Sequence, residues 1–197
     1  MASARRATRS RGTKNPDGTR TEYFEIRPSE EGLLALIREL FEHHWDEIIF
    51  GPSLQGAVFE IQFAEQPHIG YLDGYLTIGP RGPDSWHFHL CVGPHRGSAS
   101  RPTSPELAAW RRCARAAFYR DFDPAGRCGS WGFRMWNGKG EQMITIWFPN
   151  PWLDPKRRAY VETPDWARLD LWMRLRERYA GLPAEPPPVE SDPPQMH

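Results

Sequence analysis

Apolar side chains occupy every second position of residues 85–92, a pattern that predicts a β-strand with two different faces. The apolar face of this strand would consist of Trp86, Phe88, Leu90 and Val92. The opposite face would carry His87, His89 and Cys91, so three side chains that bind metals well would stand in a row. This strand is therefore the first candidate for a functional site.

The same reasoning predicts the other elements. Alternation predicts strands over residues 21–27, 57–64, 69–78, 131–136 and 142–148, the last two joined by a hairpin at Asn137–Gly140. Helical spacing predicts helices that begin at Pro28-Ser29, at Ser104-Pro105 and after Thr163-Pro164-Asp165. We expect the second of these helices to turn Leu107, Trp110, Ala114 and Phe118 inward.

The order of these elements predicts an α+β fold with a mostly antiparallel sheet and helices on one face. A strand, a helix and a hairpin follow one another twice, which favours two tandem units closed by a C-terminal helix. The other face of the sheet would then be open and would carry the histidine row.

Both ends of the chain differ from its centre in composition. Residues 1–20 are basic and poor in apolar side chains, which predicts a disordered arm. Residues 181–197 are rich in proline and acidic, which predicts a disordered tail. We expect a single folded domain over residues 21–180.

Composition excludes several classes of protein. The 25 basic and 25 acidic residues balance, so no overall field attracts nucleic acid, and a nucleic-acid partner is not expected. No apolar run has the length of a membrane span, and no membrane partner is expected. The 3 cysteines have no CxxC spacing, which predicts free thiols in a cytoplasmic protein. Arginine far outnumbers lysine, which favours a bacterial source, and the oligomeric state stays open.

A metal ion is the first ligand that the histidine row suggests. His87 and His89 would have their Cα atoms about 7 Å apart, close enough to chelate one ion. A further ligand would come from Glu60 on a neighbouring strand, from Cys91, or from His95 in the turn that follows. Two histidines with a carboxylate suit iron or zinc with open positions for a substrate, whereas added cysteine suits a closed zinc site.

A second set of residues suggests chemistry on the same face. Asp73 would orient one of the histidines as a general base. Arg134 and Trp136 alternate with core positions, so we expect them to point toward the histidines. Arg134 would bind an anionic group while Trp136 stacks on a flat ligand.

The sequence therefore predicts a metal-binding protein. The most specific form of this prediction is a metal-dependent enzyme that acts on a small planar or anionic substrate. Two alternatives remain open. One is a non-enzymatic protein that binds a planar cofactor such as a tetrapyrrole through a histidine, with tryptophans as walls. The other is an accessory or scaffold protein.

Overall fold

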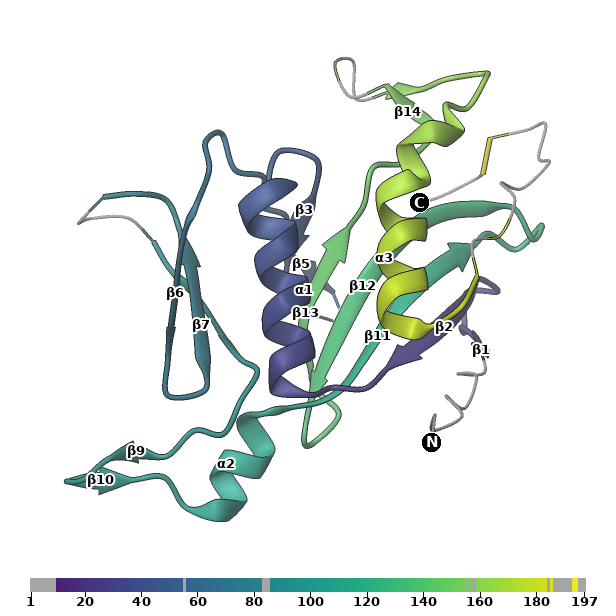
Figure 1. Cartoon of the computed structure of the whole chain (residues 1–197). Coiled ribbons are helices and arrows are strands. Elements are labelled where there is room, and N and C mark those ends of the chain that lie inside the picture. The colour runs from purple at the N-terminus through teal and green to yellow at the C-terminus, as the bar shows by residue number, and fades with distance from the viewer. Residues whose placement is uncertain are drawn as a thin grey trace, which may run out of the picture. The chain divides into compact units, whose positions relative to one another are not determined.

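The computed structural model describes residues 10–54, 56–82, 86–154, 156, 159–183, 185, 193 and 194 (Figure 1). Its helices are α1 (Glu30–His43), α2 (Pro105–Arg111), the 3-10 helix η1 (Trp166–Leu169) and α3 (Asp170–Ala180). Its strands are β1 (Ser10–Lys14), β2 (Arg20–Ile26), β3 (Ile49–Gly51), β4 (Ser53–Leu54), β5 (Ala57–Val58), β6 (His68–Leu72), β7 (Tyr75–Gly79), β8 (Phe88–Cys91), β9 (Gly97–Ser98), β10 (Arg101–Pro102), β11 (Cys113–Phe122), β12 (Cys128–Asn137), β13 (Gln142–Trp147), β14 (Leu153–Asp154) and β15 (Ala159–Tyr160).

The predicted α+β class with a mostly antiparallel sheet is confirmed. A 6-stranded sheet has the order β1-β2-β11-β12-β13-β3, and β6, β7 and β8 form a separate 3-stranded antiparallel sheet. Short two-stranded ribbons complete the structure. No helix within the described ranges is both long and apolar enough to cross a membrane. The tandem repeat of strand, helix and hairpin stays a prediction.

The chain divides into two compact units. The first unit consists of Met1–Ile26, Ala117–Phe133 and Trp147–His197. The second unit consists of Arg27–Ala116 and Arg134–Ile146.

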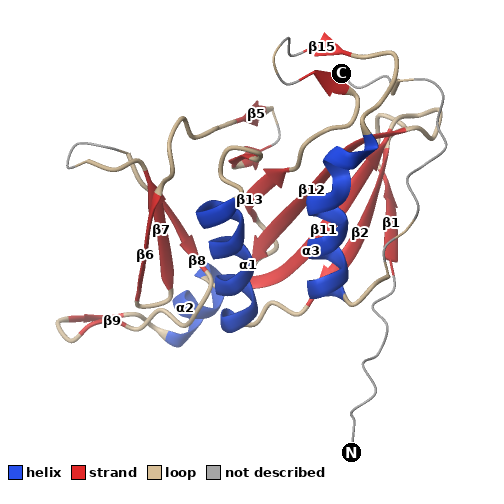
Figure 2. Ribbon diagram, turned by 45° about the horizontal axis from the view of Figure 1, so that its top comes forward, coloured by secondary structure: helices blue, strands red, loops and turns tan. Residues whose placement is uncertain are grey.

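In the first unit, α3 lies along the strands (Figure 2). Its side chain Trp172 is buried. The ring of Trp172 on α3 lies 5.7 Å from that of Phe24 on β2 and 6.4 Å from that of Phe118 on β11. Its indole N–H also donates to the carbonyl of Gly132 at 3.1 Å. These contacts fasten the closing helix, which the sequence predicts, to the sheet.

In the second unit, α1 has the sequence features of a stable helix. Ser29 caps it by accepting the N–H of Gly32 at 3.2 Å, and Glu30 and Glu31 place negative charge in the first turn. Its apolar stripe is fully buried and consists of Leu33, Leu36, Ile37, Leu40 and Phe41. The predicted first helix is therefore confirmed.

The predicted helix after Ser104 is only partly present. The Ser104 side chain caps α2 as expected, but α2 ends at Arg111, and Cys113–Phe122 form the strand β11. This strand lies between β2 and β12, and its residues Ala116, Ala117, Phe118 and Tyr119 are all buried. A strand covered on both faces loses the alternation that marks exposed strands, so its alanine-rich sequence resembles a helix.

The single strand predicted over residues 69–78 is a hairpin. Asp73 and Gly74 form its turn with positive φ angles of 45° and 85°, and Leu72 pairs with Tyr75. Asp-Gly at two positive φ angles is typical of a tight type I′ turn. The aspartate that we expected on a strand face therefore occupies a turn.

Two further strand predictions also differ from the structure. Residues 10–14 lie within the expected disordered arm, yet they form β1, whose pairing with β2 supplies backbone hydrogen bonds despite the polar sequence. The strand predicted over residues 57–64 is reduced to β5, with Phe59 exposed and Phe63 buried. Residues 1–9 of the arm and most of the tail lie outside the described residues.

Candidate functional site

The histidine row lies on an uncovered face of the three-stranded sheet in the second unit. Leu76, Ile78 and Leu90 are buried. Tyr71, which pairs with Leu76, donates to Glu30 on α1, so this face of the sheet is turned toward α1. Figures 1 and 2 show α1 beside the strands β6 and β7. His87 and His89 are both exposed, and their rings lie 6.2 Å apart with planes 26° from parallel. Both histidines are therefore exposed on the same side of the sheet, as the alternation predicts.

The register of the strands shows which residues share this face. His89 pairs with Thr77, which pairs with Gly70 on β6, and Gly79 pairs with His68. Because paired residues point to the same side, we define the histidine face by these side chains and their neighbours: His68, Gly70, Leu72, Thr77, Gly79, His87 and His89.

Two glycines on the histidine face differ in the space above them. A Cβ atom on Gly70 would meet open space. A Cβ atom on Gly79 would lie 3.2 Å from Cδ2 of His87 and 2.5 Å from the carbonyl oxygen of Trp86, so the chain passes closely over this glycine. Leu72 adds apolar surface, with 81% of its area exposed.

His89 is oriented by a neighbour on the adjacent strand. Its Nδ1 lies 2.9 Å from the hydroxyl oxygen of Thr77. When that hydroxyl accepts, the imidazole proton is fixed on Nδ1 and the lone pair of Nε2 is left for a ligand. Histidines that bind metals are commonly held in this way through their second ring nitrogen.

The alternation predicts that Trp86 lies in the core, but the structure places it at the surface. It is 45% exposed, and its ring stacks on Phe63 with centroids 5.3 Å apart. Phe63 in turn stacks on the buried Phe50 at 5.4 Å. Strand β8 begins only at Phe88, so the strict alternation does not extend to this tryptophan.

Cys91, which the sequence suggests as a further metal ligand, is covered in the structure. The side chain is buried, and its thiol donates to the carbonyl of Gly93 at 3.5 Å. Its cross-strand partner Tyr75 points to the same side and, together with the loop that follows β8, covers this end of the sheet. Burial raises the pKa of the Cys91 thiol above its ordinary value, so the thiol stays protonated at neutral pH.

His95 and Asp73, expected as a metal ligand and a catalytic group, hold a loop together instead. The Asp73 carboxylate accepts the N–H groups of Arg96 at 2.9 Å and Gly97 at 2.8 Å. Nε2 of His95 lies 3.4 Å from this carboxylate. Nδ1 of His95 lies 3.0 Å from the Thr103 hydroxyl. Both ring nitrogens of His95 are therefore occupied by protein groups.

A change of Asp73 to asparagine tests this structural role. The N–H groups of Arg96 and Gly97 hold the pKa of Asp73 below its ordinary value, so its charge stabilises the fold above about pH 4. That contribution is lost as the pH falls through the lower pKa of the folded state. We expect Asp73→Asn to lower the melting temperature at pH 7. Between pH 5 and pH 2, the melting temperature of the variant should fall less steeply than that of the wild type. An equally steep fall in the two proteins would contradict the structural role of Asp73.

The remaining predicted ligand, Glu60, is exposed and lies outside any strand. Among the residues that the structure describes, no group of three or more His, Cys, Asp or Glu side chains could hold a metal ion. The structure therefore gives no support to a metal centre built from three protein ligands.

Arg134 and Trp136 lie on β12, in the part of this strand that belongs to the second unit. Trp136 is only 9% exposed, and the guanidinium of Arg115 lies 4.0 Å from the centre of its ring. Arg134 is half-buried and also interacts within the protein. Their assignment to the same ligand surface as the histidines stays a prediction.

Sequence reasoning missed Thr77 as the partner of His89. A signal was present, because Asp73-Gly74 fixes the register of the hairpin, and Thr77 has the same parity on β7 as the exposed positions. Without that turn, residue 77 is only one polar position in a longer strand.

Comparisons with known proteins give a family and one fold likeness. No curated protein matches the chain. A solved structure described as "Crystal structure of ChuX" is similar over 76% of this chain and 75% of that chain, with 15% sequence identity and a TM-score of 0.45. The model of a family of unknown function, DUF7676, matches residues 10–181. This match covers most of the described structure, and the chain belongs to the DUF7676 family.

Proposed function

We propose that this protein binds a planar tetrapyrrole, such as haem, on the histidine face, with His89 as the axial ligand to the metal. The observation that carries the proposal is the orientation of His89, whose Nδ1 meets Thr77 at 2.9 Å while the side chain is exposed. A ring held in this way presents Nε2 outward, as an axial ligand requires.

The number of available ligands favours a tetrapyrrole over a bare ion. Structural zinc takes four protein ligands and catalytic zinc usually three, whereas the described residues offer no such group. A tetrapyrrole supplies four nitrogen ligands itself, so the protein needs to add only one or two. His89 alone meets the smaller requirement of one axial ligand.

The shape of the histidine face also suits a flat molecule. Gly70 leaves open space where a side chain would stand, and the exposed Leu72 offers apolar contact. A flat ring of mixed apolar and metal character can lie against such a surface without opening the core. Among the described residues, Asp73 and His95 contact each other rather than the histidine face, and the features of that face favour ligand binding.

Titration of the purified protein with haemin tests this proposal. We expect the Soret band to shift and to saturate at one haemin per chain. Zinc chloride titrated in a calorimeter should produce no comparable saturating heat. A haemin spectrum that stays that of the free compound would contradict the proposal, and saturable zinc binding without haemin binding would favour the bare metal site.

A further inference from the structure

A fully buried arginine lies in the first unit and is not part of the histidine face. The side chain of Arg176 on α3 has no exposed surface. Its guanidinium lies 4.8 Å from the ring centre of Phe24 and 5.0 Å from that of Trp172. Within the described residues, NH2 donates to the carbonyl of Pro183 at 2.9 Å, while Nε makes no hydrogen bond.

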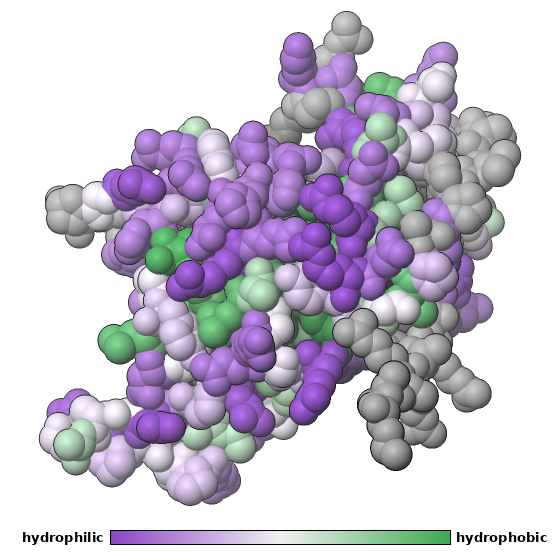
Figure 3. All heavy atoms as spheres, viewed as in Figure 1, coloured by the Kyte–Doolittle hydropathy of each residue, from purple (hydrophilic) through white to green (hydrophobic). Residues whose placement is uncertain are grey.

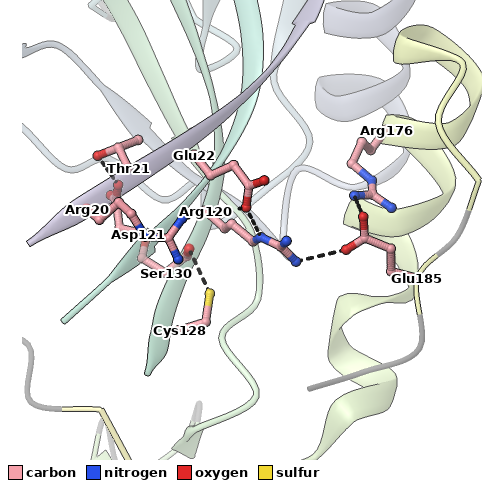
Figure 4. A network of polar contacts seen from close by, with 9 residues as sticks. All are labelled: Arg20, Thr21, Glu22, Arg120, Asp121, Cys128, Ser130, Arg176 and Glu185. Atoms are coloured by element: carbon pink, nitrogen blue, oxygen red, sulfur yellow. Dashed lines mark hydrogen bonds and ion pairs between the residues drawn. The ribbon is translucent and has the colours of Figure 1, made fainter. Parts of the chain in front are cut away.

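A buried positive charge needs a matching negative charge, because its loss of hydration is energetically costly. That charge comes from Glu185, which follows α3 in the proline-rich segment. One carboxylate oxygen of Glu185 lies 3.2 Å from NH1 of Arg176, and the other lies 2.9 Å from NH1 of Arg120 on β11 (Figure 4). One carboxylate therefore bridges two arginines.

The two arginines would keep an excess of positive charge without Glu185. Nε of Arg120 also donates to Glu22 on β2 at 2.7 Å, but no second carboxylate is recorded for Arg176 in the described part of the chain. Glu185 itself is 47% exposed, whereas Arg176 is completely covered. The carboxylate thus closes the outer side of a cationic site whose inner wall is the protein core.

From this arrangement we propose that Arg120 and Arg176 form a binding site for an oxyanion, a carboxylate or a phosphate group, and that Glu185 occupies this site as a built-in competitor. A solution anion would place two oxygens where those of Glu185 now lie. The Glu185 carboxylate would then leave the two arginines when the ligand binds.

The ionisation of Glu185 is consistent with this competition. Partial burial alone would raise its pKa, but the charges of Arg120 and Arg176 outweigh that effect and hold the pKa below its ordinary value. Glu185 is therefore charged at neutral pH and competes with any incoming anion. An uncharged glutamine at this position would compete far less.

The test is anion binding by the full-length Glu185→Gln variant. Sodium acetate and sodium phosphate are the probes, and sodium chloride at the same ionic strength is the reference. We expect at least one of the two oxyanions to bind the variant roughly tenfold or more tightly than the wild type, since a charge-assisted hydrogen bond contributes about 1.5 to 3 kcal/mol. The same anion should raise the melting temperature of the variant more than that of the wild type.

Two further variants make the result specific. Glu177→Gln removes the same charge from an exposed position on α3, and it should leave anion binding at the wild-type level. Adding Arg120→Gln to Glu185→Gln should abolish the gained binding. A preference for acetate identifies a carboxylate ligand, and a preference for phosphate identifies a phosphate ligand.

The proposal is wrong if neither oxyanion exceeds chloride on the Glu185→Gln variant, or if Glu177→Gln gains the same affinity. Should Glu185→Gln fold poorly, its refolding yield becomes the readout. Acetate or phosphate must then raise that yield above the yield in chloride, and equal yields would overturn the proposal.

Discussion

Replacing Trp172 with alanine is expected to lower the free energy of unfolding by about 3 to 5 kcal/mol, the usual cost of deleting a large aromatic side chain from a core. Trp172 is 2% exposed and contacts Phe24 and Phe118 in the first unit. The change also removes the donor to the Gly132 carbonyl, which leaves a buried acceptor without its partner. Urea unfolding followed by circular dichroism measures the effect.

Trp110 on α2 is the matched control for this variant. It is 37% exposed, and its indole N–H donates to Glu141 at 2.8 Å on the surface. Trp110→Ala should therefore cost less than about 1 kcal/mol. Equal losses in the two variants would show that α3 does not hold the first unit together.

Replacing His89 with alanine is expected to reduce the affinity for haemin by more than roughly 100-fold, because loss of an orienting partner alone costs about 10- to 100-fold. Thr77→Val removes that partner while keeping the shape of the side chain, and it should weaken binding by the smaller factor. His68→Ala is the matched control, since His68 shares the face but lies at the far strand, β6. Haemin titration followed at the Soret band measures all three.

The pattern among these variants separates a specific site from a general attraction of haemin to a face with three histidines. Equal losses in His68→Ala and His89→Ala would indicate general attraction and would contradict an axial role. A Thr77→Val variant with wild-type affinity would show that the hydrogen bond to Nδ1 is unimportant.

Elements with a strong local signal were predicted well. Ser29 and Ser104 begin α1 and α2 through their side-chain caps, and residues 137–140 form the turn of the β12–β13 hairpin. These features depend on residues close together in the sequence, so the sequence contains the information that fixes them.

Elements that depend on distant partners were predicted poorly. β11 lies between β2 and β12 and is largely buried, so its apolar and polar residues do not alternate. The sequence of β1 is polar, and its pairing with β2 supplies the stability that its side chains do not. No local pattern contains those neighbours, so propensity favoured a helix in one case and disorder in the other.

The candidate site also has features that a local pattern predicts and features that depend on distant segments. The exposure of His87 and His89 follows from the alternation within one strand. The burial of Cys91 does not follow from it, because the loop containing His95 returns over this end of the sheet and is held there by Asp73. A single strand pattern cannot show which part of its polar face another segment covers.

Resonance Raman spectroscopy of the ferrous haem complex reports the bond between iron and its axial histidine, so it tests whether His89 is that ligand. We expect an iron–histidine stretching band in the wild type and in His68→Ala, and no such band in His89→Ala. A band that persists in His89→Ala, or a wild-type complex without such a band, would contradict the assignment of His89 as the axial ligand.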